Sequence, residues 1–151
     1  MNRIELQNEA ATVAYARKLA ATIEPGQVVA LSGELGAGKS VFARALMRAL
    51  GVRDEALPSP TFALIQSYQG EGCSVAHMDW YRLDDAGEIE MLGIRDYFEP
   101  PWISIIEWPE RAPDLLPPDA IRIEITTDPD DIDLRYLSHT DSTAERKEGW
   151  S

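Results

Sequence analysis

The stretch Gly33-Glu34-Leu35-Gly36-Ala37-Gly38-Lys39-Ser40 decides the fold of this chain. It fits the pattern G-x-x-x-x-G-K-[ST] of a phosphate-binding loop, in which glycines let the backbone curl so that successive N–H groups point inward. In such a loop Lys39 reaches the β and γ phosphates of a nucleotide, and the Ser40 hydroxyl binds Mg²⁺. We therefore expect the loop and the following Val41 to bind a nucleotide, with Lys39 also acting in catalysis.

The segments on either side of the loop are of the types that the motif requires. Residues 28–31 are continuously apolar, which is typical of a strand buried on both faces of a parallel sheet. A helix is expected to begin inside the glycine-rich turn and to end at Gly51. Its apolar stripe comprises Phe42, Ala45, Leu46, Ala49 and Leu50. The order strand, loop, helix predicts an α/β fold of the P-loop NTPase class.

The elements before and after this unit also alternate in type. Asn8 is a candidate N-cap for a helix that runs to about Ile23 and is closed by Pro25-Gly26. The apolar face of that helix comprises Val13, Ala16, Leu19, Ala20 and Ile23. Residues 62–68 and 74–78 are predicted to form two strands of a hairpin, because Gly70-Glu71-Gly72 separates them.

Further elements follow in the second half of the chain. Asp84 and Asp85 are candidate caps for a short helix over residues 88–92, and residues 102–106 predict another buried strand. The alternation of Ile with Arg and Glu over residues 121–125 predicts a strand with one solvated face near an edge of the sheet. We expect a mixed, mostly parallel sheet with helices packed on it.

The size and composition of the chain indicate a single domain. It has 151 residues, of which 44% are hydrophobic and 26% charged, as in ordinary globular proteins. We expect one P-loop NTPase domain over residues 1–137 and a flexible acidic and polar tail over residues 138–151.

The net charge restricts the partners. Fourteen Lys and Arg against 26 Asp and Glu give −12, a charge that repels phosphate backbones and disfavours a broad nucleic-acid groove. A phosphate group must therefore be bound locally, by backbone dipoles and one lysine.

Nothing in the sequence indicates a membrane or an oxidising compartment. No stretch approaches the roughly 20 apolar residues of a membrane span, and Met1-Asn2-Arg3-Ile4-Glu5 lacks the apolar core of a signal peptide. Cys73 is the only cysteine, so the chain cannot form an internal disulfide. We expect a cytoplasmic protein.

The sequence favours ATP over GTP as the nucleotide. A GTPase normally carries an Asn-Lys-x-Asp segment that reads guanine, and this chain has none. Asp84-Asp85-Ala86-Gly87 fits the loose D-x-x-G pattern of a GTPase switch, but a helix cap is the simpler interpretation of these aspartates.

Two acidic residues directly follow apolar runs, where ligands of α/β sheets bind. Asp79 ends one predicted strand and Glu107 another, so both carboxylates are candidates to hold Mg²⁺ or to orient an attacking water. Thr61, in the turn Ser59-Pro60-Thr61-Phe62, is a candidate switch hydroxyl that senses the γ-phosphate through Mg²⁺, although an ordinary Ser-Pro turn explains the same residues.

Three other side chains are best explained by ordinary structural roles on sequence alone. His77 is best explained as a hydrogen-bonded histidine of the core. Trp108 either stacks on a base or plugs the end of the sheet, and the plug is favoured. Arg82 either touches phosphate or pairs with one of the many acids, and the excess of acids favours the pair.

Four motifs taken together closely resemble the TsaE (YjeE) family of bacterial P-loop ATPases. They are the phosphate loop over residues 33–40, Ser59-Pro60-Thr61-Phe62, His77-Met78-Asp79-Trp80-Tyr81-Arg82 and Glu107-Trp108-Pro109. Their order and spacing match the family from about residue 8 to about residue 127. Position 40 is Ser where Thr is commoner in the family, a change that keeps the hydroxyl.

The resemblance implies an Mg²⁺-dependent ATPase needed for the threonylcarbamoyladenosine modification of tRNAs that read ANN codons. In that pathway a TsaB–TsaD pair transfers the threonylcarbamoyl group, and the TsaE protein binds the pair and hydrolyses ATP to ADP, resetting the pair between turnovers. A chain of charge −12 is poorly suited to gripping tRNA itself, which agrees with action through a protein partner.

The resemblance also implies roles for individual residues. Lys39 and Ser40 would hold phosphate and Mg²⁺, and Thr61 would be the switch hydroxyl on the metal. Asp79 and Glu107 would serve the metal or the water, and Trp108 would lie beside the nucleotide.

Basal turnover is expected to be slow, because the motifs place no obvious catalytic arginine. Arg44, Arg48, Arg82 and Arg95 are candidates, and a partner is another source.

Two alternatives stay open from the residues. A P-loop kinase of a small molecule would use Asp79 as the base that accepts a hydroxyl proton, but we find no Arg-rich lid. A nucleotide-gated binding module would hydrolyse ATP only incidentally.

Overall fold

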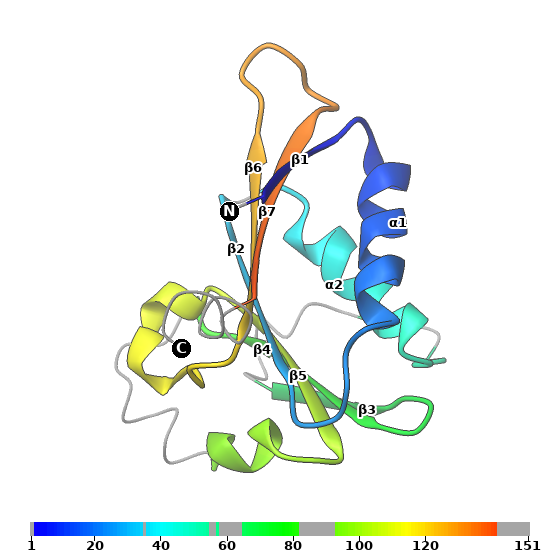
Figure 1. Cartoon of the computed structure of the whole chain (residues 1–151), viewed down its shortest axis with the longest axis vertical. Helices are drawn as coiled ribbons and strands as arrows, with labels where there is room; N and C mark the ends of the chain where they lie inside the picture. The colour runs from blue at the N-terminus through cyan, green and yellow to red at the C-terminus, as the bar shows by residue number, and fades with distance from the viewer. Residues whose placement is uncertain (1, 35, 55–56, 58–64, 82–92, 142–151) are drawn as a thin grey trace.

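A seven-stranded mixed sheet forms the centre of the molecule (Figure 1). The computed structural model describes residues 2–34, 36–54, 57, 65–81 and 93–141. The strands lie in the order β1-β7-β6-β2-β5-β4-β3. Their bounds are β1 Asn2–Leu6, β2 Val28–Gly33, β3 Ile65–Gln69, β4 Ser74–Asp79, β5 Trp102–Glu107, β6 Ile121–Thr127 and β7 Arg135–Asp141. The mixed α/β sheet that we predicted is confirmed.

The strand before the phosphate loop lies in the middle of the sheet. β2 pairs in parallel with β5 on one side and with β6 on the other. Val29, Ala30 and Leu31 are almost completely buried, because helices cover both faces of the strand. The prediction that residues 28–31 form a strand buried on both faces of the sheet is therefore confirmed.

Two α-helices pack side by side on one face of the sheet, α1 (Glu9–Ala20) and α2 (Lys39–Ala49) (Figure 1). The side chain of Asn8 accepts a hydrogen bond from the Ala11 N–H at 2.9 Å and so caps α1 as expected. α1 is shorter than predicted, because it ends at Ala20 and the chain turns before it reaches Ile23.

The predicted stripe of α2 is partly wrong. Phe42, Leu46 and Leu50 are buried, but Ala49 is exposed, while Ala43 and Met47 are buried. The buried surface is wider on that side because α2 contacts α1 as well as the sheet. Small alanines carry too little hydrophobic signal to locate the stripe from sequence.

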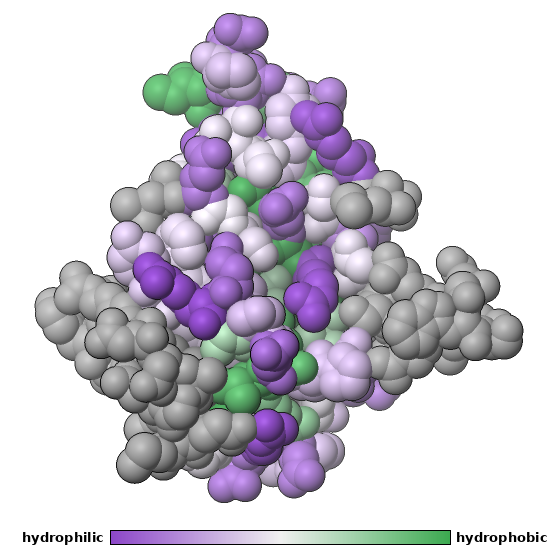
Figure 2. Space-filling view, turned by 90° about the vertical axis from the view of Figure 1, so that its left-hand side faces the viewer, coloured by the Kyte–Doolittle hydropathy of each residue, from purple (hydrophilic) through white to green (hydrophobic). Residues whose placement is uncertain are grey.

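The opposite face of the sheet is covered by short 3₁₀ helices: η1 (Ile94–Phe98), η2 (Pro109–Arg111) and η3 (Pro113–Leu115). Their buried residues form a second core with β2, β4 and β5, which includes Ile94, Ala112, Leu115 and Met78. Figure 2 looks onto the left-hand side of Figure 1, and its coloured part is mostly hydrophilic with only small hydrophobic areas. Ile94, Ala112 and Leu115 of this layer are buried, so these apolar side chains point inward.

The predicted hairpin is confirmed, since β3 and β4 pair antiparallel across the Gly70–Gly72 turn. Residues 62–64 of its first strand and the short helix expected over residues 88–92 lie outside the described residues. β4 also pairs in parallel with β5, so this hairpin extends the parallel part of the sheet.

The other side of the sheet differs from expectation. The alternating strand β6 has one exposed and one buried face, as predicted, but it is not near the edge, because β7 and β1 extend the sheet beyond it. β7 reaches Asp141, so the boundary that we placed at residue 138 cuts through a strand. β7 carries few apolar residues, chiefly the buried Leu137, and for that reason its sequence resembles a polar tail. Residues 142–151 lie outside the described residues.

No helix within the described residues is long and apolar enough to cross a membrane.

Candidate functional site

The glycines of the loop between β2 and α2 adopt the left-handed backbone that the curl needs. The φ angles are +147° at Gly33, +83° at Gly36 and +105° at Gly38. Gly33 has a second reason to be glycine, because a Cβ atom there would collide with the carbonyl oxygen of Ile125 on β6. Open space surrounds Gly36 and Gly38, so a ligand can approach their backbone.

The first turn of α2 follows this loop directly, so the loop opens on a helix N-terminus. The first N–H groups of a helix have no partner within it, and the aligned peptide dipoles favour negative charge there. Ser40 is the second residue of α2 and Val41 the third. The arrangement is that of an anion-binding nest.

Lys39 is buried at the base of the loop, although it is a lysine. Its Nζ donates a hydrogen bond to the Gly33 carbonyl at 2.7 Å and lies 3.3 Å from the centre of the Trp108 ring. Burial lowers the pKa of Lys39, whereas the nearby carboxylates of Glu107, Glu110 and Asp79 oppose that shift. The ammonium group is therefore held at the base of the loop, between the Gly33 carbonyl and the Trp108 ring.

Asp79 and Glu107 lie side by side, as their positions at strand ends predicted. They are register partners on the parallel strands β4 and β5, so their side chains leave the same face of the sheet. Glu107 is buried and Asp79 half-buried. Burial raises the pKa of Asp79, and the charge of Glu107 acts in the same direction, while a hydrogen bond from the Tyr81 N–H lowers it. Two carboxylates at this spacing can bind a divalent cation or a water.

His77 fixes the position of Glu107. Its Nε2 lies 2.6 Å from Glu107 Oε2, and both side chains are buried. His77 Nδ1 has no hydrogen-bond partner among the described residues. The interpretation as a hydrogen-bonded core histidine is confirmed, although no sequence pattern indicated that its partner would be Glu107.

Trp108 has a strained backbone. Its φ of +59° is the only positive φ of a non-glycine residue in the described part of the chain. The Trp108 ring contacts the ammonium of Lys39 and also packs against the ring of Tyr81, whose centre lies 4.7 Å from that of Trp108. Such strain persists only where surrounding contacts hold it and is concentrated at functional sites.

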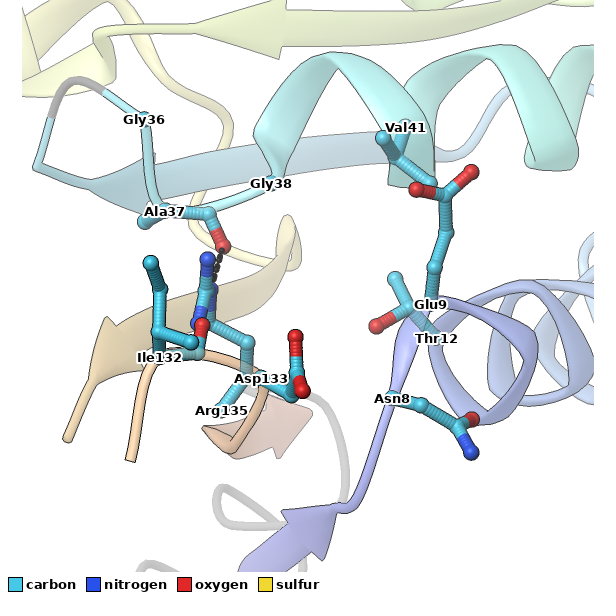
Figure 3. Close-up of a pocket in the computed structure, with 10 residues that line it drawn as sticks. All are labelled: Asn8, Glu9, Thr12, Gly36, Ala37, Gly38, Val41, Ile132, Asp133 and Arg135. Carbon is cyan, nitrogen blue, oxygen red and sulfur yellow. Dashed lines mark hydrogen bonds between the residues drawn. The ribbon is translucent and has the colours of Figure 1, made fainter. Parts of the chain in front are cut away.

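A cavity of about 290 Å³ opens on the other side of the loop, toward α1 and β7 (Figure 3). Its walls come from five segments, namely the start of α1, the loop itself, α2, the β6–β7 connection and the first residue of β7. The lining residues are Asn8, Glu9, Thr12, Gly36, Ala37, Gly38, Val41, Ile132, Asp133 and Arg135. Val41 and Ile132 give it apolar walls, and polar groups surround them.

The structure brings together most of the residues that the sequence singled out. Gly33, Glu34, Gly36 to Val41, Asp79, Glu107 and Trp108 lie around the carboxyl ends of β2, β4 and β5. Leu35, Thr61, Arg82 and Asp84-Asp85 lie outside the described residues. Arg44 and Arg48, two candidate catalytic arginines, line a separate cavity between α1 and α2.

Sequence reasoning missed the cavity and two of its contributors. Arg135 lies in the stretch between the predicted last strand and the predicted tail, and Ile132 stands in the acidic connection before it. Neither residue belongs to a sequence motif, because only the folding of the chain brings them next to the phosphate loop.

A nucleotide-binding nest at the end of a central parallel strand, with a lysine behind it and carboxylates on the neighbouring strands, defines the class of P-loop NTPase folds. The family model "Threonylcarbamoyl adenosine biosynthesis protein TsaE" matches residues 6–135 of this chain. The chain therefore belongs to the TsaE family.

Individual relatives agree with this family. The tRNA threonylcarbamoyladenosine biosynthesis protein TsaE of Haemophilus influenzae is 36% identical over 117 residues, covering 78% of this chain and 73% of the relative. The protein of the same name from Bacillus subtilis is 36% identical over 124 residues, covering 82% and 77%. The crystal structure of Bacillus subtilis YdiB superposes with a TM-score of 0.79 at 28% identity and covers 97% of this chain and 89% of that one.

Proposed function

We propose that this protein binds Mg-ATP at the phosphate loop and hydrolyses it in support of tRNA threonylcarbamoyladenosine synthesis. The observation that carries the proposal is the set of open, positive-φ glycines in front of Lys39, with Asp79 and Glu107 on the adjacent strands. The names of the relatives supply the pathway.

The sheet order indicates how ATP would lie. β5 and β4 carry the carboxylates on one side of β2, while β6 and the β6–β7 connection lie on the other. The terminal phosphate would therefore point toward Glu107 and Asp79, and the adenine would enter the cavity between Val41 and Ile132. Backbone N–H groups at the start of α2 and the ammonium of Lys39 would bind the phosphates between these ends.

The donor set fits Mg²⁺. The Ser40 hydroxyl and one or two carboxylates, from Asp79 and Glu107, are the oxygen ligands that Mg²⁺ takes together with nucleotide phosphates. Bound Mg²⁺ would neutralise charge on the β and γ phosphates. We also assign Thr61 to this metal as the switch hydroxyl, by likeness to the family.

Hydrolysis needs a positioned water and positive charge that stabilises the transferring phosphoryl group. Glu107, held by His77, is placed to orient that water, and Asp79 is placed to hold the metal. Arg135, the arginine that lines the cavity beside the loop, donates to backbone carbonyls and is therefore not directed at the terminal phosphate. We therefore propose slow basal turnover that rises when a TsaB–TsaD pair docks.

The test is phosphate release from Mg-ATP by the purified protein, alone and with a TsaB–TsaD pair. Lys39→Ala is the blank, because it removes the ammonium that meets the phosphates. We expect the pair to raise the rate at least about tenfold and Lys39→Ala to lower it by about 10²-fold or more. An unchanged rate and ATP affinity in Lys39→Ala would overturn the site.

A second result would overturn the partner assignment alone. This result is a wild-type protein that binds ATP but neither binds the TsaB–TsaD pair nor responds to it. The next measurement would then ask whether phosphate from ATP appears on a small-molecule acceptor, as a kinase would transfer it. Free phosphate without an acceptor supports hydrolysis.

A further inference from the structure

The guanidinium of Arg135 joins two walls of the cavity beside the phosphate loop. Arg135 opens β7, and its Nε donates a hydrogen bond to the Ala37 carbonyl at 3.1 Å (Figure 3). Its Nη1 donates to the carbonyls of Ile132 at 2.6 Å and Leu134 at 3.0 Å. One half-buried side chain thus connects the loop to a segment about a hundred residues later.

The bond to Ala37 fixes the direction of a loop N–H. In a trans peptide the carbonyl of one residue and the N–H of the next point in opposite directions. With the Ala37 carbonyl turned to Arg135, the Gly38 N–H points away from Arg135. Gly38 is a glycine with φ +105°, so its peptide would otherwise flip at little cost. Arg135 holds this peptide in one orientation.

The bonds to Ile132 and Leu134 fix the other wall. Ile132 is 85% exposed, which is unusual for a large apolar side chain, and it lines the cavity opposite Val41. An exposed isoleucine facing a half-buried valine makes a pair of apolar surfaces suited to a flat ring. The backbone that carries Ile132 is held by the same guanidinium that holds Ala37.

We infer that Arg135 is a positioning residue of the nucleotide site, which orients the phosphate loop and holds Ile132 as a wall for the base. This inference rests on the proposed function. Arginine is needed because the role requires several donors in a planar fork, and a lysine ammonium cannot reach all three carbonyl groups in that geometry. Three carbonyls accept its hydrogen bonds, so Arg135 acts through the backbone.

The experiment compares two ligands in the full chain. ADP reports the whole site, and inorganic pyrophosphate reports the phosphate loop without the base. Arg135→Gln and Arg135→Lys are measured by calorimetry with Mg²⁺, with Arg122→Gln as the matched control, since Arg122 is an exposed arginine of the neighbouring strand β6. Thermal unfolding of each variant is recorded in parallel.

We expect Arg135→Gln to weaken both ligands about tenfold, the effect of losing a hydrogen bond from a charged donor, and Arg135→Lys to weaken them in part. Ile132→Ser should weaken ADP several-fold and leave pyrophosphate unchanged. Arg122→Gln should change neither.

Two outcomes would overturn the inference. One is wild-type affinity for both ligands in Arg135→Gln, and the other is a loss fully accounted for by the unfolded fraction of that variant. A wild-type protein that binds no ADP would instead contradict the proposed function, so the two failures are distinguishable.

Discussion

At the scale of the residue, the site concentrates groups that are unfavourable for folding. Lys39, Glu107 and His77 are buried ionisable residues, and Asp79 is half-buried beside Glu107. Burial is unfavourable for the charged form of each of these residues, and their clustering near the carboxyl ends of β2, β4 and β5 marks this region as a candidate functional site.

The substitution Asp79→Asn tests whether the buried carboxylate lowers the stability of the fold while serving ATP turnover. Because burial raises the pKa of Asp79 above its unfolded value, the carboxyl stabilises the fold only while it is protonated, and that stability is lost as pH rises through the folded pKa. In metal-free buffer at pH 7 we expect Asp79→Asn to unfold at a higher temperature than the wild type, by roughly 2–4 °C at most, since water screens a half-buried charge.

The same substitution should lower ATP turnover by about 10²-fold. The gain in unfolding temperature should shrink as the pH falls through the raised pKa of Asp79, because the wild-type carboxyl then takes up a proton. Scanning calorimetry across this pH range decides the matter, and a variant less stable than the wild type at pH 7 would contradict the role of burial.

At the scale of the element, helix α2 is anchored at both ends by glycine. Its N-terminal end is the phosphate loop, and its C-terminal end turns at Gly51 and docks on the β3–β4 turn. The Glu71 N–H donates to the Leu50 carbonyl at 2.9 Å, which joins the helix end to that turn. The position of the loop therefore depends on a contact at the far end of the helix.

Gly51→Ala and Gly72→Ala form a matched pair for this contact. Both glycines have positive φ, +97° and +73°, so alanine costs roughly 1–2 kcal/mol at either place. A Cβ atom at Gly51 would also lie 2.6 Å from the Glu71 nitrogen, whereas open space surrounds Gly72. We expect urea unfolding to show an additional loss of about 1–3 kcal/mol for Gly51→Ala alone. Equal losses would mean that the helix end shifts without cost.

At the scale of the whole molecule, the first strand β1 and the last described strand β7 pair with each other and extend the sheet beyond β6. β7 pairs with β6 on one side and with β1 on the other, so the C-terminal strand carries the N-terminal one. Tyr15 on α1 adds a hydrogen bond at 2.7 Å between its hydroxyl and His139 Nδ1 on β7. This layer also supplies Arg135 to the cavity.

Truncation tests where the domain ends. A chain that stops after residue 137 loses the second half of β7, its pairs with both neighbours and the Tyr15–His139 hydrogen bond. A chain that stops after residue 141 keeps β7 whole and is the control. We expect the shorter chain to lose on the order of 3 kcal/mol, or roughly 6–12 °C in unfolding temperature. Equal unfolding temperatures would restore the boundary at residue 138.

The centre of the fold and the side of the site around the phosphate loop could be predicted from the amino-acid sequence. The run over residues 28–31, the glycines and Lys39 are local signals, and Asp79 and Glu107 follow from the rule that parallel strands end at one edge. These features were predictable because each depends on neighbours close in sequence or on a general property of parallel sheets.

The remaining strands and site contacts depend on the packing of segments that are distant in sequence. β1 at the start of the chain pairs with β7 near the end of the described residues, and β7 carries only Tyr136 and Leu137 as large apolar residues, so neither strand's own sequence indicates this pairing. The hydrogen bond from His77 to Glu107 spans two strands, and that from Arg135 to Ala37 joins a strand to a loop about a hundred residues away. The side of the site facing α1 and β7 therefore arises from packing between segments that are far apart in the chain, and no local pattern encodes it.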